Sequence, residues 1–184
     1  MARIQFPPLA EMSPAEKSAY DEAAAGPRGY APAPMAAWLK NPEFARRSQK
    51  LGESVRFGLN LPDRLRELAV LVVTRYWAAH YEWRIHKKEA LKHGLSAQVV
   101  EAITARRRPA FETDADRAVY DIATSILETR RVPEALYHEG VRVLGEQGVV
   151  ELVGVIGYYT FVSMTLATFE IGLPEALQPE LLEK

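Results

Sequence analysis

Signals that begin and end helices recur along the whole chain, and no stretch alternates apolar and polar residues as a strand does. Ser13-Pro14 and Asn41-Pro42 each put a capping residue directly before a proline, which is typical of a helix N-terminus. Helices are expected over residues 14–25, 42–59, 63–77, 79–93, from 96, from 113 or 114 to 130, from 133, and from 149 until Pro174. The chain is therefore predicted to be all-α.

Length and composition indicate one folded domain. The chain has 184 residues, of which 48% are hydrophobic and 26% charged, as in ordinary globular proteins. At about 100–200 residues per domain, this length corresponds to a single domain over residues 1–184. A net charge of −1 gives no overall field that would attract nucleic acid. The absence of cysteine excludes disulfides, thiolate nucleophiles and thiolate zinc sites.

Two stretches of the sequence could indicate a membrane segment or a phosphate-binding loop. Leu152 to Phe169 contains no charged residue and is about as long as the shortest membrane-spanning helices. Its many glycine, serine and threonine residues favour a helix packed against protein, and the N-terminus has no apolar signal segment. We therefore expect a cytoplasmic protein with no membrane partner. Arg106-Arg107-Arg108 indicates a solvated loop, with phosphate binding as the alternative.

The helix expected over 79–93 segregates its charges unusually. Its cationic side chains fall on one broad side, whereas Glu82, His86, Glu89 and His93 form a stripe along the edge of the apolar face. Glu82 and His86 are four residues apart, so their side chains are neighbours on one helix face. A carboxylate beside an imidazole supports a general acid, and the alternative is an exposed helical ion pair. We predict that Glu82 and His86 belong to a site.

Other polar residues near this helix carry a functional and a structural interpretation. Glu67 precedes an apolar run from Leu68 to Val73, where it either caps a wet helix N-terminus or is half-buried with a raised pKa. His80, Tyr81 and Trp83 would line a small-molecule pocket or simply fill the core. His80, Glu82 and His86 have a poor spacing for a shared metal ion, so no metal site is predicted.

Two motifs make the residues recognisable. Leu61-Pro62-x-x-Leu65-x-Glu67-Leu68 is followed by Tyr81-Glu82-Trp83-x-x-His86-x-x-x-Ala90-x-x-x-Gly94-Leu95-Ser96. Together they resemble the carboxymuconolactone decarboxylase-like family, which shares an all-helical fold with alkylhydroperoxidase D. The likeness is specific over Leu61 to about Ile103. It implies an alkylhydroperoxidase D-like helical bundle with an N-terminal helical extension over 1–60, a family core over 61–105 and C-terminal helices over 106–184.

The resemblance also implies a chemistry. Family peroxidases carry Glu, Cys-x-x-Cys and His; here Glu67 and His86 match, while Ala79 and Glu82 occupy the cysteine positions. The decarboxylase branch, which has no cysteine at these positions, resembles the chain better and implies a cofactor-independent lyase acting on a small carboxylated lactone or ring compound. Its catalytic residues would be His86 as general acid and base, Glu82 as the residue that orients it, and Glu67 as a second proton carrier. His80, Tyr81 and Trp83 would bind the substrate.

Two alternatives remain open at this stage. The chain could be a non-catalytic ligand-binding or structural oligomer of the same fold, or it could inherit a peroxidase label that the missing cysteines do not support. The family assembles as trimers and hexamers, so a homo-oligomer (a trimer, hexamer or dimer) is expected. The helix over 151–170 or the helix over 67–77 would contribute to its largest interface.

Overall fold

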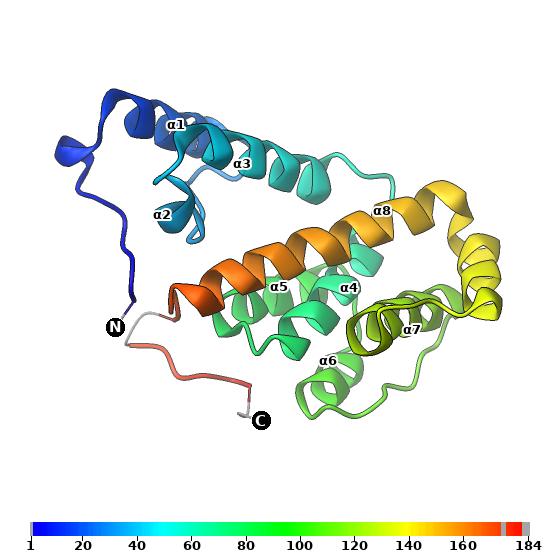
Figure 1. Ribbon diagram of the computed structural model, residues 1–184. Coiled ribbons are helices and arrows are strands. Elements are labelled where there is room, and N and C mark those ends of the chain that lie inside the picture. The colour runs from blue at the N-terminus through cyan, green and yellow to red at the C-terminus, as the bar shows by residue number, and fades with distance from the viewer. Residues whose placement is uncertain (1, 174–175, 182–184) are drawn as a thin grey trace. The chain divides into compact units, whose positions relative to one another are not determined.

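The computed structural model describes residues 2–173 and 176–181, and every regular element in them is a helix (Figure 1). A short 3-10 turn, Leu9–Glu11, precedes the α-helices. These are α1 (Pro14–Ala25), α2 (Met35–Trp38), α3 (Pro42–Phe57), α4 (Asp63–Tyr76), α5 (His80–Lys92), α6 (Ala97–Thr104), α7 (Asp114–Thr129) and α8 (Glu134–Thr168). The all-α prediction is confirmed.

The described residues group into two compact units. The first contains those of 1–59 together with 164–172, and the second contains those of 60–163 together with 173–184. The second unit holds every residue that the sequence nominates for the site. The expectation of a single domain over 1–184 rests on length alone and stays a prediction.

In the first unit, α1 and α2 both pack on α3. The helix starts are those expected from the sequence. Ser13 and Glu16 cap α1 reciprocally, and the Asn41 side chain accepts a hydrogen bond from the Phe44 backbone N–H at the start of α3. The four-residue helix α2 was not expected, because a single turn after a proline-rich loop has no periodicity that a sequence pattern can show.

The second unit is built around α4, which packs against α5, α6 and α7. Residues 65–75 of α4 are all buried, so this helix has no solvent-facing side over three turns. An ion pair between Arg64 and Asp116 joins α4 to α7. The backbone N–H of Leu61 donates to Oε2 of Glu151 at 2.7 Å, which fixes the start of α4 to α8.

The last helix, α8, consists of two helical segments joined at a sharp break. Two helices were expected here, one from Pro133 and one from Val149, and the structure places the break between them at Gly145, a few residues before Val149. Gly145 has φ 72° and ψ 166°, a conformation that essentially only glycine adopts. The helix ends at Thr168; Pro174, the expected stop, lies outside the described residues.

Of the described helices, α8 alone is long and apolar enough to cross a membrane by length and composition. Its most apolar window is 56% buried inside the protein, and the core helix of a soluble protein passes the same test. Glu151, within this helix, accepts a hydrogen bond from the backbone N–H of Leu61. A core role within the fold accounts for its composition.

Candidate active site

Three charged side chains of helix α4 are buried: Arg66, Glu67 and Arg75. Only 6%, 1% and 6% of their surfaces are exposed. Charged residues are almost never buried to this extent unless they are paired. Each of them therefore needs a partner, and the partners of Arg66 and Glu67 define the candidate site.

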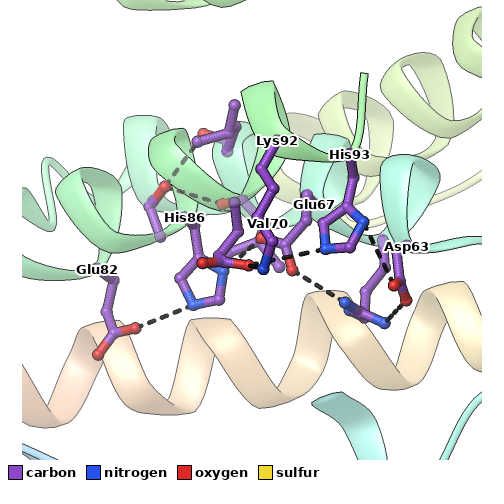
Figure 2. Close-up of polar contacts among 11 residues, drawn as sticks. Asp63, Glu67, Val70, Glu82, His86, Lys92 and His93 are labelled. Carbon is purple, nitrogen blue, oxygen red and sulfur yellow. Dashed lines mark hydrogen bonds and ion pairs between the residues drawn. The ribbon is translucent and has the colours of Figure 1, made fainter. Parts of the chain in front are cut away.

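Glu67 faces an imidazole from the neighbouring helix (Figure 2). Oε2 of Glu67 lies 2.6 Å from Nδ1 of His86 on α5, and both side chains are almost completely buried. On the other edge of the ring, Nε2 of His86 lies 3.3 Å from Oε2 of Glu82, which is four residues earlier on the same helix. This second contact is within ion-pair distance but lacks the geometry of a hydrogen bond. The imidazole of His86 thus stands between two carboxylates.

Arg66 balances part of this negative charge. Its NH2 lies 3.1 Å from Oε1 of Glu67, and its NH1 lies 2.5 Å from Oδ1 of Asp63. Both oxygens of Glu67 therefore have a partner, Arg66 on one side and His86 on the other. The network continues to His93, whose Nδ1 lies 3.5 Å from Oδ2 of Asp63 near the end of α5. A chain of charged groups connects the buried imidazole to the half-exposed His93.

These surroundings shift the pKa of both members of the central pair. Burial alone would lower the pKa of His86, but the carboxylates of Glu67 and Glu82 outweigh it and hold this pKa above its ordinary value. Burial would raise the pKa of Glu67, but His86 and Arg66 outweigh it and keep this pKa below its ordinary value. The pair is therefore most stable as an imidazolium facing a carboxylate.

The protonation of the ring follows from these shifts. An ionised Glu67 can only accept hydrogen bonds, so Nδ1 of His86 carries a proton and donates it to Glu67. A neutral ring would then present the lone pair of Nε2 to Glu82, which is unfavourable if that carboxylate is ionised. A second proton on Nε2 removes this repulsion. The arrangement can hold a transferable proton in a dry environment.

An aromatic side chain from α8 closes the site. The ring of Tyr159 packs edge-on against the imidazole of His86, with 4.7 Å between the ring centroids. Tyr159 in turn contacts Tyr158 in the same edge-to-face manner. Both tyrosines are buried. Apolar aromatic surface beside a charged pair excludes water and strengthens the electrostatic interactions within it.

The structure brings Glu67, Glu82 and His86 together, while the expectation that they form a catalytic site lining a pocket stays a prediction. It corrects two alternatives considered from the sequence. Glu82 and His86 do not form an exposed helical pair, because both side chains are buried. Glu67 neither caps a wet helix end nor has a raised pKa, because two cationic groups contact it in the interior.

The residues expected to bind substrate are more scattered. Trp83 is fully buried and His80 is half-buried. Tyr81 lines a cavity of about 600 Å³ between α5 and the segment around Leu177 and Glu180. Glu67, Glu82 and His86 are not among the residues that line this cavity. A binding role for His80, Tyr81 and Trp83 stays a prediction.

Metal ligation finds no support in the part of the chain that the structure describes. No group of three or more histidine, aspartate or glutamate side chains there could hold a metal ion. His86 uses both ring nitrogens toward carboxylates rather than toward a common centre with His80.

Sequence reasoning missed two charged residues of this region. Arg66 adjoins Glu67 in sequence, and an arginine at the start of an apolar run carries the same signal as the glutamate. Arg75 near the end of that run was also passed over, although it is as buried as Arg66. The signal available for both was a charge inside a stretch that is otherwise apolar.

Comparisons with known proteins agree with this architecture. Residues 42–125 match the model of the Carboxymuconolactone decarboxylase family, a segment that includes α4, α5 and the three site residues. Among curated proteins, none matches this sequence.

Two solved structures share the fold. One is an alkylhydroperoxidase AhpD core, an uncharacterised peroxidase-related protein from Ralstonia eutropha JMP134. Its TM-score is 0.74 at 14% sequence identity, and the match covers 95% of this chain and 93% of the Ralstonia chain. The other is a protein of unknown function from Agrobacterium tumefaciens whose description links it to AhpD and antioxidant defence. Its TM-score is 0.65 at 19% identity, over 73% of this chain and 93% of its own. Over residues 42–125 the chain is similar to the Carboxymuconolactone decarboxylase family, and its fold is that of alkylhydroperoxidase D-like proteins, while the chain itself contains no cysteine.

Proposed function

We propose that the chain is a cofactor-independent acid–base enzyme, a lyase that acts on a small carboxylated lactone or ring compound. The observation that supports this proposal is the buried imidazole of His86 between the carboxylates of Glu67 and Glu82, at 2.6 Å and 3.3 Å. A buried, protonated imidazole that contacts two carboxylates can act as a general acid. The family whose model matches residues 42–125 is named for decarboxylation of carboxymuconolactone.

The proposed reaction needs only a proton donor in a dry environment. Loss of CO2 breaks the bond between the carboxyl group and a ring carbon and leaves the electron pair as a conjugated dienolate. The reaction ends when a proton is added at carbon. His86 would supply this proton and recover another from solvent, and its positive charge would favour the developing anion.

The distances suggest a division of roles among the three side chains. Glu67 makes the shorter contact with His86 and is the more deeply buried, so we assign it to orienting the ring. The sequence had suggested Glu82 for that role. Glu82 is the least buried of the three, at 7% exposure, so we assign it to passing protons between His86 and the outside.

Thiol peroxidase chemistry is the alternative that the fold relatives suggest, and the residues of this chain argue against it. The chain has no cysteine, and Ala79 and Glu82 stand at the positions of the family's redox pair. No other side chain here supplies a thiolate that could attack a peroxide and then form a disulfide. The acid–base residues are present without the nucleophile that they serve in peroxidases.

A second candidate is a non-catalytic binding or structural protein with the same fold. One observation favours it: neither of the two cavities identified in the second unit is lined by Glu67, Glu82 or His86. In that case the buried cluster would serve only to fix α4 against α5. Activity measurements distinguish the two candidates.

The test is decarboxylation of carboxymuconolactone and a panel of related carboxylated lactones, followed as release of CO2. The His86→Gln variant should lower kcat by about 10²-fold or more, the size expected for a general acid. Glu89→Gln changes a half-exposed carboxylate two turns further along α5 than Glu82 and serves as the matched control. No turnover by the wild type across the panel, or equal rates for wild type and His86→Gln, would favour the non-catalytic candidate.

We also propose that the protein acts in the cytoplasm as a homo-oligomer. Val150 and Val153 on α8 are 71% and 49% exposed, and the helix face between them and Gly157 carries no charge. A Cβ added at Gly154 or Gly157 would meet nothing within 4 Å, so the backbone of α8 is open to close approach there. An exposed apolar strip of this kind is suited to an interface between copies of the chain.

A further inference from the structure

Arg75 is a buried charge that the candidate active site does not use. Its Nε donates to the backbone carbonyl of Thr104 at 2.8 Å, while NH1 is buried and has no hydrogen-bond partner among the described residues. The other buried acidic and basic side chains of the described residues all form ion pairs: Arg66, Glu67, Glu82 and Asp116. Arg75 alone among them forms no ion pair within the described part of the chain, which is an unfavourable state for a buried cation.

A second arginine makes this imbalance larger. Arg106, in the loop that follows α6, lines the same cavity as Arg75 and forms no ion pair within the part of the chain that the structure describes. Burial and the positive charge of Arg106 both lower the pKa of Arg75. Two residues further along, Arg108 does have a partner, since its NH1 and NH2 lie 2.5 and 2.9 Å from the carboxylate of Asp121. In the three-arginine segment, the positive charge of Arg108 is therefore balanced by Asp121, whereas the positive charge of Arg106 is not balanced by a carboxylate.

The cavity that these arginines share has a volume of about 480 Å³ and lies where α4, α6 and α7 meet. Tyr76, Trp77 and Tyr120 contribute aromatic surface to its lining, and Val72, Ile103 and Leu127 contribute aliphatic surface. Nε1 of Trp77 is a second buried donor without a partner among the described residues. Cavities of this size, mostly apolar with a few convergent polar groups, are typical of small-molecule sites.

We propose that this cavity binds a small planar monocarboxylate, with its ring against Tyr76, Trp77 and Tyr120 and its carboxylate between Arg75 and Arg106. The carboxylate would supply the counter-charge that both guanidinium groups lack, in the bidentate geometry that arginine favours. Glu128 also lines the cavity, so the lining as a whole carries two positive charges and one negative charge. That balance accommodates one negative charge and disfavours the two that a phosphate carries.

This site is separate from the candidate active site and goes beyond the proposed function. None of the residues that line the cavity is Glu67, Glu82 or His86. Arg75 lies eight residues after Glu67 on α4, which is about 12 Å along the helix. A ligand held by Arg75 and Arg106 would therefore leave the proton-carrying imidazole untouched.

The experiment is isothermal titration calorimetry of the full chain with 2-naphthoate. Three comparisons accompany it: the neutral 2-naphthamide, inorganic phosphate, and the variants Arg106→Gln and Arg107→Gln. Arg107 is an exposed neighbour that does not line the cavity, so its variant is the matched control. We expect 2-naphthoate to bind to the wild type and to Arg107→Gln with equal affinity, and about tenfold or more weakly to Arg106→Gln, as for loss of a charged hydrogen bond. The amide and phosphate should bind at least tenfold more weakly than 2-naphthoate.

Other outcomes would overturn the proposal. They are no binding of 2-naphthoate, equal binding of phosphate, or equal weakening by Arg106→Gln and Arg107→Gln, which would indicate general attraction of anions. Arg106 is exposed, so its replacement should leave the fold intact, and circular dichroism checks this. His86→Gln should retain full binding of 2-naphthoate. This last variant separates the cavity from the proposed reaction, because lyase activity can fail while binding persists.

Discussion

Nδ1 of His86 lies 2.6 Å from Oε2 of Glu67, and this contact joins α5 to α4 inside the second unit. The two residues are 19 positions apart in the chain and both are almost fully buried. Because burial disfavours an isolated charge on either side chain, each group depends on the other to stay ionised. The same contact therefore contributes to stability and sets the proton affinity of the imidazole.

The first prediction concerns stability against pH. The pKa of His86 is raised, so its contribution to stability is complete below the ordinary value of 6.5 and is lost as the pH rises through its folded-state pKa. The pKa of Glu67 is lowered, so its contribution is complete above 4.5 and is lost as the pH falls through its folded-state pKa. Between pH 4.5 and 6.5 both contributions are present in full.

Urea unfolding of wild type and Glu67→Gln between about pH 4 and about pH 9 measures this effect. The free energy of unfolding should differ most between the two proteins inside the range and should converge above it. Glu101→Gln, which removes an exposed carboxylate on α6, should keep the wild-type curve. A difference between wild type and Glu67→Gln that is constant across pH would mean that the pair is not ionised.

Much of the fold follows from local signals in the sequence. Ser13, Asn41, Ser96 and Thr113 each accept a backbone hydrogen bond at the start of the helix that the sequence assigns to them. The two helical segments of α8 were expected, but the sequence placed the start of the second one at Val149, whereas the break between them lies at Gly145. That outcome depends on what both halves of the helix pack against, and no local pattern contains this information.

The contacts of the candidate site could likewise be predicted only in part from the sequence. The contact between Glu82 and His86 could be predicted because a spacing of four residues places them on one helix face. The contact between Glu67 and His86 depends on how α4 packs against α5, so only the family resemblance suggested it. Arg75 and Arg106 come from different elements, and their shared cavity cannot be read from spacing at all.

The second prediction concerns the break in α8. Replacement of Gly145 by alanine should destabilise the protein by about 1–3 kcal/mol, because alanine is strained at the backbone angles found there. A Cβ at this position would meet nothing within 4 Å, so the cost is conformational and not steric crowding. Glu146→Ala, at the exposed next residue, should change stability by no more than about 0.5 kcal/mol. Equal unfolding midpoints for Gly145→Ala and the wild type would argue against the strained geometry.

The third prediction concerns assembly. Light scattering at micromolar concentration should give a mass that is a multiple of 20.6 kDa. Val153→Asp places a charge on the exposed strip of α8 and should shift the mass toward a single chain. Leu51→Asp changes a residue that is 53% exposed on α3 and should leave the mass unchanged. A wild-type mass of 20.6 kDa would show that the strip does not mediate self-association.

The fourth prediction concerns peroxides. The purified protein should not reduce an alkyl hydroperoxide with a dithiol as electron donor, because the chain contains no cysteine. The measurement is consumption of peroxide compared with that of the heat-denatured protein. Turnover above this background would contradict the assignment of acid–base rather than thiol chemistry.

The charge on His86 is the property on which the proposed function depends, and nuclear magnetic resonance measures it directly. The nitrogen and proton shifts of the His86 imidazole, followed from pH 5 to pH 9 or about two units around its ordinary pKa, should show a ring that stays doubly protonated through the ordinary value of 6.5. In Glu67→Gln the ring should lose its second proton at a lower pH, because burial then acts with less opposition. A His86 ring that is neutral at pH 6.5 in the wild type, or that titrates identically in Glu67→Gln, would contradict the account.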